Sequence, residues 1–118
     1  MDVNAITLST ASPRTVGEAF NIGVLLKLPS GGPIYNYYLT GTVDIYDSSG
    51  TITAIANQPL TATPLGHETI VRATYMLYTG TGRPITTADT YRAVYTVKMS
   101  DNSISSWEQY LILSPKPY

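Results

Sequence analysis

The amino-acid sequence predicts an all-β fold, an antiparallel β-sandwich of seven or eight strands in which residues 1–118 form a single domain. Glycines and prolines recur at short intervals, and the segments between them alternate apolar and polar residues, as half-buried strands do. The chain also contains seventeen Thr and ten Tyr, residue types that favour strands. No segment repeats with the helical period of about 3.6 residues, so the crossover helices of a parallel sheet are not expected.

Three strands are expected in the first half of the chain. Residues 3–8 form the first, and Pro13 after it predicts an edge strand that changes direction, because proline cannot donate to a strand ladder. Residues 18–28 form the strongest core strand, and residues 39–46 form the third. The residues expected to face inward are Phe20, Ile22, Val24, Leu26 and Leu28 in the second strand, with Val43 and Ile45 in the third.

A turn and further strands follow. Residues 47–50, with the sequence DSSG, predict a tight turn, because Asp and Ser accept local backbone hydrogen bonds and Gly permits a positive φ. Residues 51–56 are expected to return as a short edge strand, and residues 59–64 to form an irregular segment between two prolines. Two of the remaining strands are expected at 68–78 and 105–114. The inward residues of the 68–78 strand are Val71, Ala73, Tyr75 and Leu77.

Residues 87–99 alternate almost without interruption and place Tyr91 at the start of a buried strand. The inward residues are Tyr91, Ala93, Tyr95, Val97 and Met99. In immunoglobulin-like sandwiches, a tyrosine near the start of the sixth strand sends its hydroxyl back to the backbone a few residues upstream, which fixes the loop between the sheets. The segment DTYRAVY resembles this tyrosine corner, with Ala93 where antibody domains have a cysteine. The alternative is that Tyr91 is simply a large strand residue.

The whole pattern therefore resembles an immunoglobulin-like or fibronectin type III-like domain without a disulfide. The chain has no cysteine and no tryptophan in its third strand, which distinguishes it from antibody domains. The resemblance implies a two-sheet sandwich in which Tyr91 has a structural role.

The charge pattern argues against nucleic-acid partners. The formal net charge is −1, and the seven Lys and Arg residues are spread along the chain rather than gathered in a basic stripe. The first residues, MDVNAITLSTASP, lack the basic start and apolar core of a signal peptide. No apolar stretch is long enough to span a bilayer. We therefore expect no nucleic-acid binding and no membrane insertion.

The sequence predicts neither an enzyme nor a cofactor site. His67 is the only histidine, and on a strand the adjacent Glu68 would point to the opposite face. Asp44 and Asp47 are three residues apart and would not share a face of one strand, as paired catalytic carboxylates must share a cleft. With no cysteine and no second histidine, no soft-metal site is expected.

The tyrosines and the outer strands carry the functional prediction. The tyrosines at 35, 37 and 38, and those at 46, 78, 110 and 118, are candidates for the surface. Such rings pair within sheets, form a protein interface, or stack on sugars. The first and last expected strands carry few of the charges that guard sheet edges. The predicted interface residues are Ile6, Leu8, Tyr35, Tyr37, Tyr38, Trp107, Tyr110 and Ile112.

These observations favour a non-enzymatic structural or assembly protein that packs against copies of itself or against other coat or surface proteins. A capsid, turret or decoration subunit of a virion fits the low charge and the abundance of Thr and Tyr, and a virion or an extracellular surface is the expected location. The alternative is a ligand-binding module of a secreted adhesin or enzyme, with weak carbohydrate binding.

Overall fold

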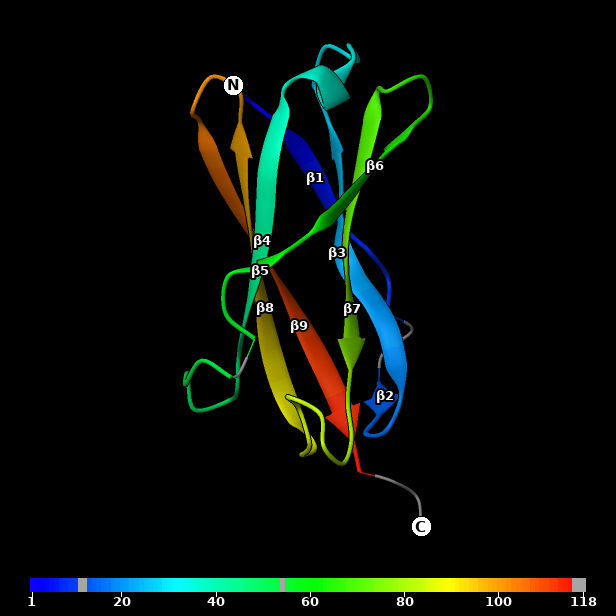
Figure 1. Cartoon of the computed structure of the whole chain (residues 1–118), viewed down its shortest axis with the longest axis vertical. Helices are drawn as coiled ribbons and strands as arrows, with labels where there is room; N and C mark the ends of the chain where they lie inside the picture. The colour runs from blue at the N-terminus through cyan, green and yellow to red at the C-terminus, as the bar shows by residue number, and fades with distance from the viewer. Residues whose placement is uncertain (11–12, 54, 116–118) are drawn as a thin grey trace.

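The computed structural model describes residues 1–10, 13–53 and 55–115, which contain nine β-strands and one short 3₁₀ helix (Figure 1). The strands are β1 (Asn4–Thr7), β2 (Arg14–Thr15), β3 (Ala19–Lys27), β4 (Tyr38–Tyr46), β5 (Gln58–Pro59), β6 (Thr61–Leu65), β7 (Ile70–Tyr78), β8 (Asp89–Met99) and β9 (Ile104–Ser114). The 3₁₀ helix η1 (Ile34–Asn36) precedes β4. The strand number exceeds the expected seven or eight because β2 and β5 have only two residues each.

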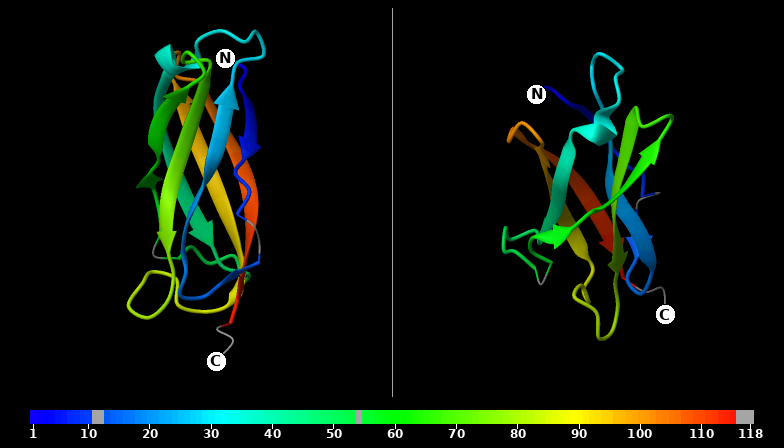
Figure 2. Two further views of the ribbon diagram at one scale, coloured as in Figure 1. Left: turned by 90° about the vertical axis from the view of Figure 1, so that its right-hand side faces the viewer. Right: turned by 45° about the horizontal axis from the view of Figure 1, so that its top comes forward.

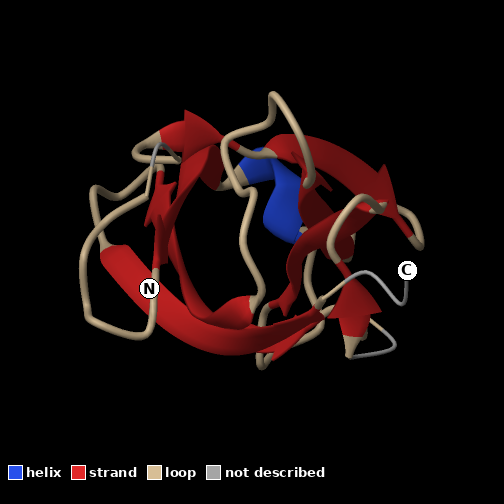
Figure 3. Ribbon diagram, turned by 90° about the horizontal axis from the view of Figure 1, so that it is seen from below, coloured by secondary structure: helices blue, strands red, loops and turns tan. Residues whose placement is uncertain are grey.

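The strands form two sheets, so the predicted all-β, two-sheet architecture is confirmed (Figure 2). One sheet has the order β1-β3-β7-β6 and the other has the order β2-β9-β8-β4-β5. Neighbouring strands run antiparallel except β2, which pairs with β9 in parallel. Viewed from below, the strands enclose a common interior (Figure 3). β1 and β2 lie at edges of different sheets, so the chain changes sheets near Pro13, where the change of direction was expected.

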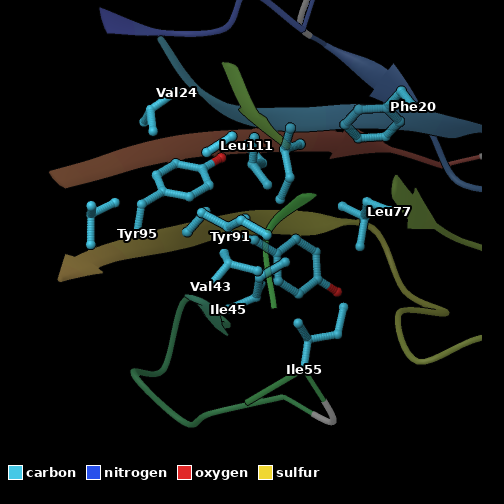
Figure 4. Close-up of a cluster of buried hydrophobic side chains, with 14 of the residues drawn as sticks. Phe20, Val24, Val43, Ile45, Ile55, Leu77, Tyr91, Tyr95 and Leu111 are labelled. Atoms are coloured by element: carbon cyan, nitrogen blue, oxygen red, sulfur yellow. The ribbon is translucent and has the colours of Figure 1, made fainter. Parts of the chain in front are cut away.

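The core lies between the sheets and follows the alternation of the sequence (Figure 4). The seven residues expected to face inward from the second and third predicted strands are all buried. The same holds for the five inward residues of β8. Tyr75 of β7 is the exception, because it is only half-buried and packs against the margin of the core.

The prediction for residues 51–65 was wrong in two respects. Residues 51–53, 55 and 56 form no strand, although Ile52 bridges to Tyr46, and the edge strand of this sheet is β5. Residues 59–64 were expected to be irregular, but Thr61–Leu65 form β6, which pairs with β7. The physical reason is that buried Ile55 anchors the loop, after which Asn57 turns the chain at φ 51° with its amide bound to the Asp44 carboxylate at 2.7 Å. Pro64 is tolerated because β6 is an edge strand.

Tyr91 makes the hydrogen bond expected of a tyrosine corner. Its hydroxyl donates to the backbone carbonyl of Thr87 at 2.7 Å, and the side-chain hydroxyl of Thr87 lies 3.0 Å from the Tyr91 hydroxyl oxygen. The side chain is 3% exposed, so the hydroxyl is held inside the fold, at the point where the chain enters β8.

A second chain of hydrogen bonds joins the two sheets through Gln109. The hydroxyl of buried Tyr95 donates to the Gln109 side-chain oxygen at 2.7 Å, and the Gln109 amide donates to the Leu8 carbonyl at 2.7 Å. Burial raises the pKa of Tyr95, and a hydrogen bond with the backbone of Gly23 partly offsets this effect. These contacts hold the end of β1 against β9, so the two strands lie on the same side of the molecule (Figure 2).

Candidate functional site: the outer face and open edge of β9

The β9 strand divides its side chains between the core and the solvent. Its odd-numbered residues from 105 to 113 are buried or half-buried, whereas the even-numbered residues from 104 to 112 point out of the sheet. Among these, Ile104, Tyr110 and Ile112 are 64%, 66% and 47% exposed. Large apolar groups therefore stand at both ends of the outer face of this strand.

The outer face continues onto β8 and β4 through one row of three cross-strand neighbours. The strand register places Tyr110 beside Arg92, and Arg92 beside Tyr46. The Arg92 guanidinium lies 4.7 Å from the centroid of the Tyr46 ring, in the geometry of a cation–π contact. It also donates to Glu108 at 2.8 Å. The Arg92 side chain is thus held by contacts with both Tyr46 and Glu108.

A shallow hollow lies beside this row. It is lined by the turn at residues 47–50 together with Thr90, Arg92 and Tyr110. The turn is rigid because the carboxylate of Asp47 accepts hydrogen bonds from Ser49 and Thr51, while Asp89 accepts two from Ser48. The hollow therefore combines an exposed aromatic ring, a guanidinium and hydroxyl groups.

The same hydrogen bonds keep the two carboxylates ionised. The hydroxyl of Ser49 is the largest of the influences that lower the pKa of Asp47, which the neighbouring charge of Asp89 opposes. The hydroxyl of Ser48 lowers the pKa of Asp89 in the same way. Both shifts favour the ionised form, in which the two carboxylates accept the hydrogen bonds that hold the turn.

One long edge of β9 has no neighbouring strand in the described part of the chain. β2 pairs with β9 only at Leu113 and Ser114, which leaves residues 104–112 without a strand on that side. The edge strand of the facing sheet on the same side of the molecule is β1, whose Ile6 is 71% exposed. The edge and the exposed side chains of β9 together form one surface, which we call the β9 surface; it comprises Ile104, Ser106, Glu108, Tyr110 and Ile112.

The predicted interface residues fall into two groups. Ile6 is exposed on β1, an edge strand of one sheet, whereas Tyr110 and Ile112 are exposed on β9 of the other sheet. Leu8 and Trp107 are half-buried, and Trp107 packs against the core.

The tyrosines at 35, 37 and 38 lie at the end of the molecule that also carries the turn between β8 and β9. Tyr35 and Tyr37, which are 37% and 40% exposed, belong to η1 and the residue after it rather than to a strand. Their backbones bind two neighbouring loops, through the carbonyl of Glu68 at 3.2 Å and the amide of Ser100 at 2.7 Å. Tyr38 is half-buried against the core, and burial raises its pKa.

The positions considered for catalysis are widely dispersed. His67 and Glu68 lie in the turn between β6 and β7, both with positive φ. Within the described residues, no three His, Cys, Asp or Glu side chains are grouped so that they could hold a metal ion.

Sequence reasoning missed Arg92 and Ile104. Alternation along residues 87–99 does place Arg92 on the outer face, but it gives no information about which residues of β4 and β9 lie beside it. The register that brings Tyr46, Arg92 and Tyr110 together depends on the pairing of β8 with β9 and on its pairing with β4, which is distant in the sequence. Ile104 was missed because the last strand begins one residue earlier than the expected 105.

The described residues include no helix with the length and hydrophobicity needed to cross a lipid bilayer. Comparison of the chain with protein-family models, curated proteins and solved structures gave no match.

Proposed function

We propose that this protein is a non-enzymatic structural subunit with an immunoglobulin-like fold, which works by packing against copies of itself or against other coat or surface proteins. The single observation that carries this proposal is the β9 surface. It joins three large exposed side chains to a sheet edge that lacks a neighbouring strand in the described part of the chain. Exposed apolar groups rimmed by polar ones are typical of protein interfaces.

The strand order supports the immunoglobulin-like part of the proposal. Immunoglobulin-type sandwiches place strands A, B, E and D in one sheet and G, F and C in the other, with C′ added in some. The order β1-β3-β7-β6 corresponds to A-B-E-D, and β9-β8-β4-β5 corresponds to G-F-C-C′. Tyr91 at the start of β8 then occupies the place of the tyrosine corner in strand F.

The composition supports a role in a coat. Charged residues make up 13% of the chain, about half the share usual in soluble proteins. Hydroxyl groups from Thr, Ser and Tyr supply much of the remaining polarity, and they can be packed against a neighbour at a lower desolvation cost than charges. A virion subunit, such as a capsid, turret or decoration protein, is the setting that we propose.

Light scattering across a range of concentrations tests the proposal, together with the structure of the native assembly. We expect the wild-type chain to associate, and the β9 surface to be covered in an interface of roughly 1,000 Å² or more. Replacing Ile104, Tyr110 and Ile112 by Ser should abolish association. Replacing Met76 and Tyr78, which are exposed on the opposite sheet, should leave it unchanged. A chain that stays monomeric and binds no coat partner would contradict the proposal.

A carbohydrate-binding module is the second candidate, and the hollow beside Tyr110 favours it. An exposed ring next to a guanidinium and hydroxyl groups offers a stacking platform and hydrogen bonds for a sugar. Calorimetric titration with oligosaccharides tests this function, with Tyr110→Ala expected to remove binding. Tyr78→Ala is the matched control, because Tyr78 is also exposed and has Arg83 5.1 Å from its ring centroid.

A further inference from the structure

The β9 strand lacks the protection that the other sheet edges have. Sheet edges are usually guarded by shortness, proline, lysine or a bulge. β1 has four residues, β5 has two and contains Pro59, and β6 contains Pro64. β9 has eleven residues with neither proline nor lysine, and its pairing with β8 shows no break in register. Its one charged residue, Glu108, is already paired with Arg92.

The open edge also presents its backbone groups at the same residues whose side chains point outward. The amide of Met99 donates to the carbonyl of Ser103, which fixes the alternation of hydrogen-bonded pairs between β8 and β9. The backbones of residues 105, 107, 109 and 111 therefore face β8. Those of residues 104, 106, 108 and 110 face away from β8, towards the open edge. The bond from the Val16 amide to the Ser114 carbonyl agrees with this assignment.

We propose that the occupant of this edge is the β9 strand of a second copy, which pairs with it antiparallel around a two-fold axis beside Trp107. Ser106 lies opposite Glu108 of the second copy, and Ile104 lies opposite Tyr110 of the second copy. By symmetry each of these pairs occurs twice. The pairing joins the two five-stranded sheets into one continuous sheet. It rests on the proposed function and specifies the contact through which copies pack.

This register is the one that the side chains favour. With the axis at Glu108, two carboxylates would stand directly opposite each other, which is unfavourable. An axis at Ser106 would place Ile104 opposite a carboxylate. An axis at Gln109 would bring Ile104 against Ser114, whose carbonyl already binds Val16. The axis beside Trp107 places a hydroxyl opposite each carboxylate and an aromatic ring opposite each Ile104, both favourable cross-strand pairs.

The same complementarity selects a second copy over an unrelated partner. One strand supplies both members of each pair, the carboxylate with its hydroxyl and the isoleucine with its ring. An isologous contact requires this kind of self-complementary surface. The net charge of −1 leaves little repulsion between copies.

Crosslinking tests the register directly, because the chain contains no cysteine. In the proposed pairing, positions 104 and 110 of different copies are separated by about 5.5 Å between Cα atoms. The two residues at position 104, one from each copy, are offset by six residues along the strands, roughly 20 Å. We expect a mixture of Ile104→Cys and Tyr110→Cys chains to form a dimer with a bismaleimide of about 8 Å span, a reach between these two separations. Neither variant alone should form a crosslinked dimer. Equal crosslinking in the single-variant samples would overturn the register.

Substitutions that introduce a charge at Ser106 provide an independent test of the pairing in solution. Ser106→Glu places like charges opposite each other twice, so the dissociation constant from sedimentation equilibrium should rise roughly tenfold. Ser106→Lys places opposite charges together, so association should be unchanged or tighter. Thr42→Glu, on the same face two strands away, is the matched control and should have no effect. Equal constants for the Glu and Lys variants would contradict the pairing.

The outcomes separate this inference from the proposed function. If the wild-type chain associates but shows neither the mixed crosslink nor the difference between the Ser106 variants, the β9 pairing is wrong and assembly uses another surface. If the wild-type chain is monomeric at every concentration but binds a different coat protein, the pairing is again wrong and the structural role stands. If it binds neither itself nor a coat protein, both fail.

Discussion

The hydroxyl of Tyr91 donates a hydrogen bond of 2.7 Å to the carbonyl oxygen of Thr87, four residues earlier. This bond fixes the loop between β7 and β8 at the start of the strand that carries most of the core of its sheet. It is also the hydrogen bond that, together with the strand order, supports the proposed immunoglobulin-like fold.

Tyr91→Phe should lower the free energy of unfolding by about 1–2 kcal/mol, because it removes the hydrogen bond that the buried Tyr91 side chain donates to the Thr87 carbonyl. Denaturant unfolding measures the change. Tyr110→Phe is the matched control, because the Tyr110 side chain is 66% exposed, and it should change stability little. An unchanged midpoint for Tyr91→Phe would show that the bond has no structural weight.

Truncation of the β3 core residues should be more costly. Ile22 and Leu26 are both fully buried, so replacing either by Ala should cost about 2–5 kcal/mol through lost burial and the cavity left behind. Ile6→Ala, at an exposed position on the neighbouring strand, is the control. Equal effects at Ile6 and Ile22 in urea unfolding would contradict the packing described above.

Gln109 should couple the stability of the two sheets. Gln109→Leu leaves the Tyr95 hydroxyl and the Leu8 carbonyl without their partner, so we expect a loss of about 1–3 kcal/mol. In a double-mutant cycle with Tyr95→Phe, the two losses should be clearly non-additive, because both variants break the same bond. Additive losses would mean that Gln109 acts only through its contact with Leu8.

Asp101 should make stability depend on pH in the acid range. Hydrogen bonds from the hydroxyl and then the amide of Ser103 lower the pKa of Asp101 to about 2, with a contribution from the amino group of Met1. Because the folded pKa lies below the unfolded value of 3.8, the stabilisation is present above about pH 4 and is lost as the pH falls towards 2. Asp101→Asn and Ser103→Ala should both make the melting temperature depend less steeply on pH in this window. A slope as steep as that of the wild type in either variant would contradict this account.

The strands that face the core were predictable from the sequence because burial imposes a period of two on them. Alternation placed Phe20 and Ile22 in β3 and Tyr91 in β8 correctly. It failed at Ile52 and Ile55, where two apolar residues suggested a strand. Ile55 instead anchors a loop from inside the core, and Ile52 is 44% exposed. Whether an apolar residue pairs in a strand or anchors a loop depends on tertiary contacts that the local pattern does not contain.

The candidate site was predictable only in part, for a related reason. The low charge of the last strand indicated a weakly guarded edge, and Tyr110 and Ile112 lie on its outer face. The row formed by Tyr46, Arg92 and Tyr110 depends on the register of three strands, of which β4 and β8 are separated in the chain by β5, β6 and β7. Alternation within one strand carries no information about that register.

Amide hydrogen exchange along β9 tests the central claim most directly. The amides of Trp107 and Gln109 face β8 and should be protected at every protein concentration. The amides of Ser106 and Glu108 face the open edge, so they should exchange rapidly in dilute solution and become protected as the concentration rises and a second copy covers them. Rapid exchange at Ser106 and Glu108 in the fully assembled state would show that the β9 edge is not where this protein meets its neighbours.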